Sequence, residues 1–330
     1  MTPKILLLST GGTIASVASE KGLTPQTSGH DLLDTLGAMP YDIEVKDLME
    51  LDSSNIQPEE WAKIAQAVFE AKDDYVGIVI SHGTDTMAYT ASMLTFMLPN
   101  INVPVVLTGS QVPMNILLSD APANLKTAFA AAVSCKPGVY LAFNRKVMLG
   151  CRAVKVRTTS FDAFESVNFP NVAEVTSDGL VFNKEAQAVL TKEAGQLNTK
   201  IETNVAVVKL FPGFDPEMLK MMGKMGIKGL VIEAYGLGGM TYIRRNLVAA
   251  VGELTRKGIP VIAVSQCLYE RSDLTKYEVG RQALLEGAIS AHDMTTESAI
   301  TKLMWGLGQN MDLPQIATFF NTNVAGEVSL

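Results

Sequence analysis

Hydroxyl-bearing residues flanked by glycine follow three short apolar runs in the first half of the chain. These segments are Ser9-Thr10-Gly11-Gly12-Thr13, Ser81-His82-Gly83-Thr84-Asp85 and Thr108-Gly109-Ser110-Gln111, and a fourth polar group is Asp52-Ser53-Ser54-Asn55. A hydroxyl becomes an effective nucleophile when a base or a nearby cation helps to remove its proton, and when backbone N–H groups stabilise the oxyanion that forms. We therefore treat these segments as candidates for covalent catalysis.

The turn that ends at Thr13 has more than one interpretation. Gly11-Gly12 can make a tight turn after a strand, with the threonine capping the next helix, and local sequence alone favours this structural role. A phosphate-binding loop is a further option, but neither GxGxxG nor GxxxxGK[ST] is present. The remaining alternative is a nucleophilic threonine on a tightly turned segment.

The second segment places a hydroxyl beside a carboxylate, at Thr84 and Asp85. His82 suggests a Ser/His/Asp triad, but no GxSxG motif is present. Such a histidine more often packs at a strand end, and Asp85 could cap a following helix. Lys155 is a candidate cation for the hydroxyl, although a lone lysine in an apolar run is commonly a surface residue whose stem alone is buried.

The composition bounds the class of protein that could carry these segments. The 330 residues are 47% hydrophobic and 18% charged, which is typical of a globular protein with a large core. A net charge of -7 without a dense basic run argues against nucleic-acid binding. Three scattered cysteines and three scattered histidines predict neither a disulfide framework nor a metal site. The first apolar run is too short for a signal peptide or a membrane span, so we expect a cytoplasmic protein that does not bind membranes.

Short apolar runs alternate with amphipathic stretches, which predicts an α/β protein with mainly parallel sheets. Ligands of such sheets bind at the carboxyl ends of the strands. The predicted strands cover residues 4–9, 75–81, 103–108, 138–143, 205–211, 229–234 and 259–265. The polar stretch before residue 205 predicts a larger N-terminal domain (1–190), a linker (191–204) and a smaller C-terminal domain (205–330). A small hairpin is expected around Ser177-Asp178-Gly179, and a helix is expected to begin at Pro58.

Taken together and in order, the four polar segments resemble those of the bacterial L-asparaginases, closest to the type I, cytoplasmic branch. The resemblance covers essentially the whole chain. It continues through Ala153-Val154-Lys155-Val156-Arg157-Thr158, Phe164-Glu165-Ser166-Val167-Asn168, Tyr235-Gly236-Leu237-Gly238 and Lys302-Leu303.

The resemblance implies hydrolysis of L-asparagine to L-aspartate and ammonia, with neither cofactor nor metal. Thr13 would be the nucleophile that forms the acyl-enzyme, and Thr84, Asp85 and Lys155 would move protons. The substrate would be bound by Gly12, Ser53, Ser54, Gly83, Thr84, Asp85 and Ser110. The family also implies a homotetramer, built as a dimer of dimers, with active sites near a dimer interface.

Three positions depart from what the resemblance leads us to expect. Many relatives place a tyrosine in the lid, here residues 16–29, but this chain has Leu23 at that place and no tyrosine before Tyr41. Relatives complete the amine site with an acidic residue from the neighbouring subunit, for which Glu270 and Asp273 are the candidates. Some type I members bind a second asparagine through an arginine where this chain has Glu233, which weakens the case for the same effector site.

Two alternative functions remain to be weighed. Subunits of tRNA-dependent amidotransferases share these motifs, but they would normally carry an additional N-terminal domain, and this chain begins directly at its first predicted strand. A non-catalytic amino-acid-binding descendant would keep the fold without turnover. It would have no chemical reason to retain Thr13, Thr84, Asp85 and Lys155 together. The preference between asparagine and glutamine stays open, because the two amides differ by one methylene.

Overall fold

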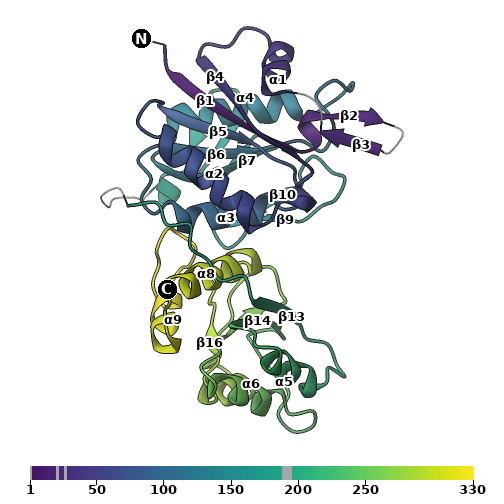
Figure 1. Ribbon diagram of the computed structural model, residues 1–330, viewed down its shortest axis with the longest axis vertical. Coiled ribbons are helices and arrows are strands. Elements are labelled where there is room, and N and C mark those ends of the chain that lie inside the picture. The colour runs from purple at the N-terminus through teal and green to yellow at the C-terminus, as the bar shows by residue number, and fades with distance from the viewer. Residues whose placement is uncertain (1, 20–21, 26–27, 188–194) are drawn as a thin grey trace. The chain divides into compact units, whose positions relative to one another are not determined.

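The computed structural model describes residues 2–19, 22–25, 28–187 and 195–330 (Figure 1). The chain divides into two compact units, Met1–Thr199 and Lys200–Leu330, which we call unit 1 and unit 2. The division falls inside the 191–204 segment that was expected to connect two domains. Among the described helices, none combines the length and the apolar composition needed to cross a membrane.

Unit 1 is built on an eight-stranded sheet of order β12-β11-β8-β7-β6-β5-β1-β4. The strands are β1 (Lys4–Gly11), β4 (Asp42–Leu51), β5 (Gly77–Ser81), β6 (Pro104–Thr108), β7 (Gly138–Phe143), β8 (Lys146–Leu149), β11 (Ala173–Thr176) and β12 (Gly179–Phe182). The five strands from β4 to β7 run parallel, whereas β8, β11 and β12 continue the sheet antiparallel. The sheet is therefore mainly parallel, as predicted, and the expected hairpin is formed by β11 and β12.

Helices cover both faces of this sheet (Figure 1). They are α1 (Gly29–Leu36), α2 (Pro58–Ala71), α3 (Met87–Met97) and α4 (Ala121–Ser134). Side chains of α1 and α4 share one buried cluster with Ile5, Leu7 and Val79 of the sheet, and α2 and α3 lie on the other side. Coverage of both faces explains why β5 and β6 are buried throughout and lack alternation. The strand β4 was not predicted, because this edge strand is largely accessible and carries charged residues.

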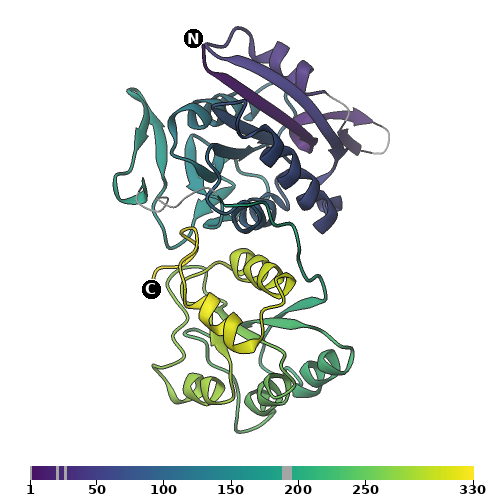
Figure 2. The same ribbon diagram turned by 60° about the vertical axis from the view of Figure 1, so that its left-hand side comes forward.

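Two hairpins complete unit 1, and both lie near the carboxyl ends of the parallel strands. One pairs β2 (Ser16–Ser19) with β3 (Gly22–Pro25), and the other pairs β9 (Ala153–Lys155) with β10 (Phe164–Ser166). The first hairpin extends from the edge of the unit in both views (Figures 1 and 2). It falls within the segment expected to form a lid.

The order of the parallel strands determines where a ligand can bind. Starting from β1, the chain adds β4 on one side and then returns to add β5, β6 and β7 on the other. The topological switch point therefore lies between β1 and β5, and in open α/β sheets ligands bind outside the carboxyl ends of the strands at this point. Thr13 follows β1 and Thr84 follows β5, so the fold brings the two candidate threonines to the switch point.

A chain of buried hydrogen bonds supports the end of β5. His82 has no exposed surface; its Nδ1 lies 2.7 Å from the carbonyl oxygen of Gly83, and its Nε2 lies 2.9 Å from Thr90 Oγ1. Because a carbonyl only accepts, Nδ1 carries the proton and Nε2 accepts from Thr90, which in turn accepts from Trp61 Nε1 at 3.0 Å. Burial lowers the pKa of His82 to about 4. The histidine is thus a neutral packing residue rather than a member of a triad.

Unit 2 contains a four-stranded parallel sheet of order β13-β14-β15-β16. Its elements are β13 (Val205–Lys209), α5 (Pro216–Lys224), β14 (Gly229–Ala234), α6 (Leu247–Thr255), β15 (Val261–Ser265), α7 (Glu278–Leu285), β16 (Ile289–Ser290), α8 (Thr296–Gly308) and α9 (Leu313–Phe320). In Figures 1 and 2, α8 and α9 lie on one side of this sheet and α5 and α6 on the other. Both units therefore have the predicted α/β architecture.

A fully buried ion pair holds the C-terminal segment of unit 2 against α8. Lys302 and Glu327 contact each other, and neither side chain has any exposed surface. Lys302 also donates to the carbonyl oxygen of Thr322 at 2.8 Å, and Glu327 accepts from the backbone N–H groups of Val324 and Ala325. A buried pair of this kind tolerates the loss of one partner poorly, because the other is then left as an uncompensated charge.

We predict that Lys302→Met lowers the free energy of unfolding of unit 2 by about 3–5 kcal/mol, since it leaves Glu327 buried without its counter-ion. The double variant Lys302→Met/Glu327→Leu should lose less than the sum of the two single variants. Arg256→Met, which removes an exposed ion pair with Glu286, should cost below about 1 kcal/mol. Urea unfolding in a Trp61→Phe background, where Trp305 is the one remaining tryptophan, measures these three variants and the single variant Glu327→Leu by fluorescence. Equal costs for Lys302 and Arg256 would contradict the prediction.

We predict that His82 makes unit 1 less stable in acid. Its pKa falls from 6.5 in a solvated chain to about 4 in the fold. The stabilisation is therefore complete above pH 6.5 and is lost as the pH falls towards 4, because the unfolded chain takes up the proton first. The difference corresponds to about 3 kcal/mol.

The measurement is urea unfolding at pH 7 and pH 4.5 in a Trp305→Phe background, where Trp61 is the one remaining tryptophan. His82→Gln should reduce the acid-induced loss of stability by about 2–3 kcal/mol. The matched control is His30→Gln, which changes an exposed histidine and should leave the acid-induced loss unchanged. If His82→Gln and the control behave alike, the buried histidine is not the source of acid sensitivity.

Candidate active site

The two turns at the switch point are in direct backbone contact. A Cβ atom added to Gly12 would lie 2.3 Å from the backbone nitrogen of Gly83, which is closer than any real side chain allows. Gly12 also has a φ of +81°, a conformation that glycine adopts without strain. The glycines are therefore required for the strand ends to approach this closely. Thr13 and Thr84 each follow directly on one of these two glycines.

Ser53 joins the same contact from the third strand end. This buried residue begins the short 3₁₀ turn η2 (Ser53–Asn55), which follows β4. A Cβ on Gly83 would lie 2.6 Å from Ser53 Oγ. The Ser53 hydroxyl accepts from the backbone N–H of Asp85 at 3.2 Å, and its carbonyl accepts from Thr86 Oγ1 at 2.7 Å. Ser53 is thus held tightly against the segment that carries Thr84.

Lys155, Thr84 and Asp85 form one connected set. The ammonium of Lys155 donates to Thr84 Oγ1 at 2.8 Å and to Asp85 Oδ1 at 2.6 Å. The Lys155 side chain is 17% exposed, Thr84 is buried and the Asp85 side chain is 61% exposed. Lys155 is therefore not a surface lysine with a solvated head, and Asp85 does not cap α3, whose N-cap residue is Thr86. The set can accept, donate and relay a proton at Thr84.

The segment after β6 supplies the next strand end. Ser110 is buried, and its hydroxyl donates to the carbonyl oxygen of Val112 at 2.6 Å. The backbone N–H groups of Gln111 and Val112 donate to the carboxylate of Asp120, at 3.0–3.1 Å. This buried carboxylate fixes the segment. Neither Asp120 nor the side chain of Gln111 was assigned a role from the sequence, because local spacing does not reveal which distant loop they contact.

Two predicted site residues are less closely tied to the set. Ser54 is exposed, and both its hydroxyl and its backbone N–H donate to Asp52. Thr13 is half-buried and begins the 3₁₀ turn η1 (Thr13–Ala15), whose Ile14 carbonyl accepts from the N–H of Met114. This last bond, 3.4 Å long, links the turn after β1 to the segment after β6.

The predicted lid falls partly outside the described residues. Its residues 20, 21, 26 and 27 are not described, nor is the side chain of Leu23, whose backbone pairs with Ala18 in the β2–β3 hairpin.

The candidate acidic residues of unit 2 differ in how they are held. Asp273 accepts from the N–H and the hydroxyl of Thr275, at 3.1 and 2.6 Å, and these bonds lower its pKa. Glu270 instead occupies a left-handed conformation, with a φ of +73°. Glu233 accepts from Thr296 Oγ1 at 2.9 Å and lies 3.8 Å from the ammonium of Lys209.

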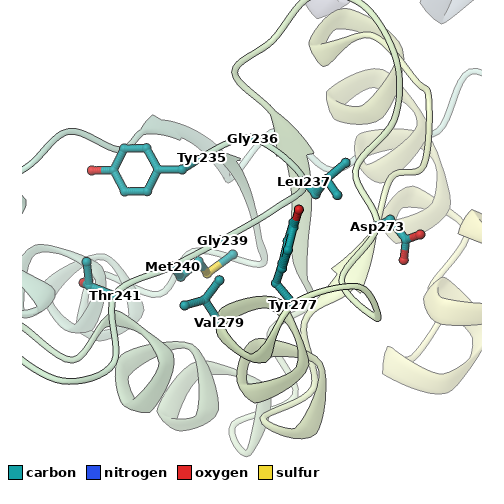
Figure 3. A pocket seen from close by; sticks show the side chains of 10 residues that line it. Tyr235, Gly236, Leu237, Gly239, Met240, Thr241, Asp273, Tyr277 and Val279 are labelled. Atoms are coloured by element: carbon teal, nitrogen blue, oxygen red, sulfur yellow. The ribbon is translucent and has the colours of Figure 1, made fainter.

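Unit 2 also has a cavity of its own, of about 350 Å³ (Figure 3). The Tyr235-Gly236-Leu237 segment lines it together with Asp273 and Tyr277. Figure 3 shows the ring of Tyr277 standing between Leu237 and Val279, while Tyr235 extends to the opposite side. The Tyr235 hydroxyl is buried without a hydrogen-bond partner in the described part of the chain. The cavity contains none of the residues predicted to react.

Comparisons with known proteins identify relatives that match both units of the chain. The N-terminal asparaginase domain model matches residues 4–188, and the glutaminase/asparaginase C-terminal domain model matches residues 204–320. L-asparaginase from Thermococcus kodakarensis is 45% identical over 329 residues, which are 99% of each chain. Its solved structure matches with a TM-score of 0.94 at 44% identity, over 99% of each chain.

Two further relatives extend the comparison. The structure of L-asparaginase I from Vibrio cholerae matches with a TM-score of 0.87 at 30% identity, over all of both chains. A glutamyl-tRNA(Gln) amidotransferase subunit from Pyrococcus abyssi is 36% identical over 344 aligned positions, which cover 99% of this chain and 77% of that relative. Both domain models and the full-length relatives lead to one conclusion: the chain belongs to the asparaginase family.

Proposed function

We propose that this protein is an L-asparaginase that hydrolyses L-asparagine to L-aspartate and ammonia through a threonine acyl-enzyme. The observation that carries the proposal is the Lys155–Thr84–Asp85 set beside the contact between Gly12 and Gly83. A nucleophilic threonine needs a neighbouring proton acceptor and a cation to lower the cost of removing its proton. The two glycine turns place Thr13 next to the segment that holds such groups.

In the proposed reaction, Thr13 Oγ attacks the side-chain amide carbon of asparagine. The hydroxyl proton goes to the leaving nitrogen, the C–N bond breaks and ammonia departs. Water then attacks the acyl carbon, its proton returns to Thr13 and aspartate is released. Thr84 and Lys155 would carry protons between these atoms. The backbone N–H of Thr84 would stabilise the oxyanion, and such a donor typically contributes about 3 kcal/mol.

The substrate would be held by the remaining groups at the strand ends. Gly12 and Gly83 bring the two turns into backbone contact, and they would offer backbone groups to the substrate. Ser53 and the exposed carboxylate of Asp85 would bind the α-carboxylate and the α-amine, and Ser110 would face the amide. Ser54 would have to exchange its bond to Asp52 for one to the substrate.

The comparisons favour hydrolysis over ammonia transfer to a tRNA-bound substrate. The chain aligns with the Thermococcus L-asparaginase over 99% of both chains. The identity is also higher than with the Pyrococcus abyssi protein, at 45% against 36%. A non-catalytic role is disfavoured because Lys155 contacts Thr84 and Asp85, an arrangement that amino-acid binding alone does not require.

Finer assignments follow from the sequence motifs. We propose a cytoplasmic enzyme of the type I kind that forms a homotetramer, needs no metal or cofactor, and has minor glutaminase activity. Two of the three relatives compared are archaeal and the third is L-asparaginase I of Vibrio cholerae, so the proposal of the bacterial branch rests mainly on the motifs. Many relatives have a lid tyrosine where this chain has Leu23. The proton acceptor for Thr13 must therefore be another group. Glu233 is acidic where some type I members have an arginine that binds a second asparagine. Its opposite charge argues against the same effector site in this chain.

We further propose that Glu270 of a neighbouring subunit completes the amine site. Asp273 is the second candidate, and its carboxylate accepts two hydrogen bonds from Thr275. Glu270 occupies a left-handed φ that is costly for a non-glycine residue, and such strain is typical of functional positions.

We predict that Thr13→Ala, Thr84→Val and Lys155→Met each lower kcat for ammonia release from L-asparagine by at least about a thousandfold, because each removes a group that acts on the reacting atoms. Thr35→Ala, which changes an exposed threonine of α1, is the matched control and should retain full activity. Ammonia is measured by a coupled assay at saturating asparagine. Full activity of Thr13→Ala would exclude it as the nucleophile.

We predict that Glu270→Gln raises KM for asparagine about tenfold or more, through loss of a charge-assisted bond to the amine, and that Asp273→Asn changes it less. Co-expression of Glu270→Gln with Thr13→Ala tests the subunit of origin. If the glutamate comes from the partner, mixed assemblies contain one site with both groups intact and regain normal KM. If the activity of the mixed assemblies never exceeds that of the separate variants, Glu270 acts at the site of its own subunit or at no active site.

A further inference from the structure

The side-chain amide of Gln111 bridges two loops at the candidate active site. Its Nε2 donates to the carbonyl oxygens of Thr158 and Ser160, both at 3.1 Å. Its Oε1 lies 3.4 Å from Thr84 Oγ1. Thr158 and Ser160 belong to the loop between β9 and β10, which directly follows Lys155. One side chain therefore contacts both the hydroxyl of the catalytic set and the loop next to its cation.

The orientation of this amide is determined by its partners. A carbonyl oxygen only accepts, so the group that faces Thr158 and Ser160 must be the NH₂ of Gln111. A flipped amide would direct Oε1 at two carbonyl oxygens and lose both bonds. The oxygen of Gln111 therefore faces Thr84, and because an amide oxygen cannot donate, Thr84 must be the donor.

The direction of the Thr84 proton follows from this orientation. Lys155 donates to Thr84 Oγ1 at 2.8 Å, so the ammonium takes one acceptor site of the hydroxyl, and the single hydroxyl proton is free for Gln111. The hydrogen bonds then run in one direction, from Lys155 through Thr84 and Gln111 to Thr158 and Ser160. The proton of Thr84 points away from Lys155.

The bond between Thr84 and Gln111 is weak enough to be exchanged. Its 3.4 Å exceeds the 2.5–3.0 Å of an ordinary O–H···O bond. The NH₂ group of Gln111 is held more firmly, because it donates to two carbonyl oxygens. The backbone of Gln111 is fixed as well, since its N–H donates to the carboxylate of Asp120. A proton held loosely in a defined direction can be passed to a reacting atom at little cost.

We propose that Gln111 is a positioning residue, which orients the Thr84 hydroxyl through its amide oxygen and holds the loop that follows Lys155. It touches neither substrate nor the reacting atoms, and it acts through Thr84. The inference rests on the proposed function, because it concerns how the Thr84–Lys155 pair moves protons in that reaction.

The test compares Gln111→Met, which keeps the length of the side chain but removes both polar ends, with Gln66→Met as matched control. Gln66 lies on α2, away from the strand ends, and its side-chain amide donates to Glu70 at 2.9 Å. We expect Gln111→Met to lower kcat about 10- to 100-fold, with KM within about threefold of wild type. The control should keep both parameters.

A double-mutant cycle separates orientation of Thr84 from simple support of the loop. If Gln111 acts through the hydroxyl, Gln111→Met should lower kcat in the wild type and leave it nearly unchanged in a Thr84→Val background. The same fold-loss in both backgrounds would overturn the proposal. Turnover is slow in the Thr84→Val background. It is therefore measured with an aspartate β-ester, whose leaving group departs more easily than ammonia.

Further outcomes keep the result decisive. If Thr84→Val has no measurable turnover with the ester, the split between kcat and KM decides, and a raised KM with an unchanged kcat overturns the proposal. Gln111→Glu provides a second variant: its carboxylate would face the carbonyl oxygens of Thr158 and Ser160 without a proton to donate, so we expect it to lose kcat as Gln111→Met does, and full activity would contradict the inference. Wild-type protein without asparaginase activity would contradict the proposed function, whereas an active wild type with a fully active Gln111→Met would contradict this inference alone.

Discussion

The close approach of Gly12 and Gly83 is the constraint on which the rest of the site depends. With 2.3 Å between a hypothetical Cβ and a backbone nitrogen, any side chain at Gly12 would separate the ends of β1 and β5. That separation would move Thr13 away from the segment holding Thr84, and it would loosen the packing of Ser53 behind Gly83. The sheet order places these strand ends side by side, and the missing side chains let them meet.

The buried polar groups around this contact act as a support rather than as reactants. His82 lies immediately before Gly83 and is held through Thr90 and Trp61, while Asp120 fixes the segment after β6. Each is buried and has partners, as the cost of desolvating polar groups requires. Neighbouring strand ends thus have fixed backbones, on which the exposed Asp85 and half-buried Thr13 are presented to a substrate.

Much of the fold could be predicted from the sequence, because it depends on local patterns. Runs such as that of β5 are apolar without alternation, which is what a strand buried on both faces requires. The edge strand β4 was missed for the opposite reason, since its accessible and charged residues carry no such pattern. The residues of the Lys155 set were identified only through their order along the chain. Nothing local connects Lys155 to Thr84 across 71 positions; that contact exists because the β9–β10 hairpin folds back beside the strand ends.

The same limit applies more strongly to Gln111, and it shows what a sequence motif leaves out. Its neighbour Ser110 could be assigned by resemblance, but the role of Gln111 depends on two backbone carbonyls of a loop about 50 positions away. Backbone acceptors are the same for every residue type, so no side-chain pattern could have indicated them. The direction of the Thr84 proton is therefore a property of the fold rather than of any motif. Because one amide can satisfy those carbonyls in only one orientation, the fold determines which way the hydroxyl points before any substrate binds.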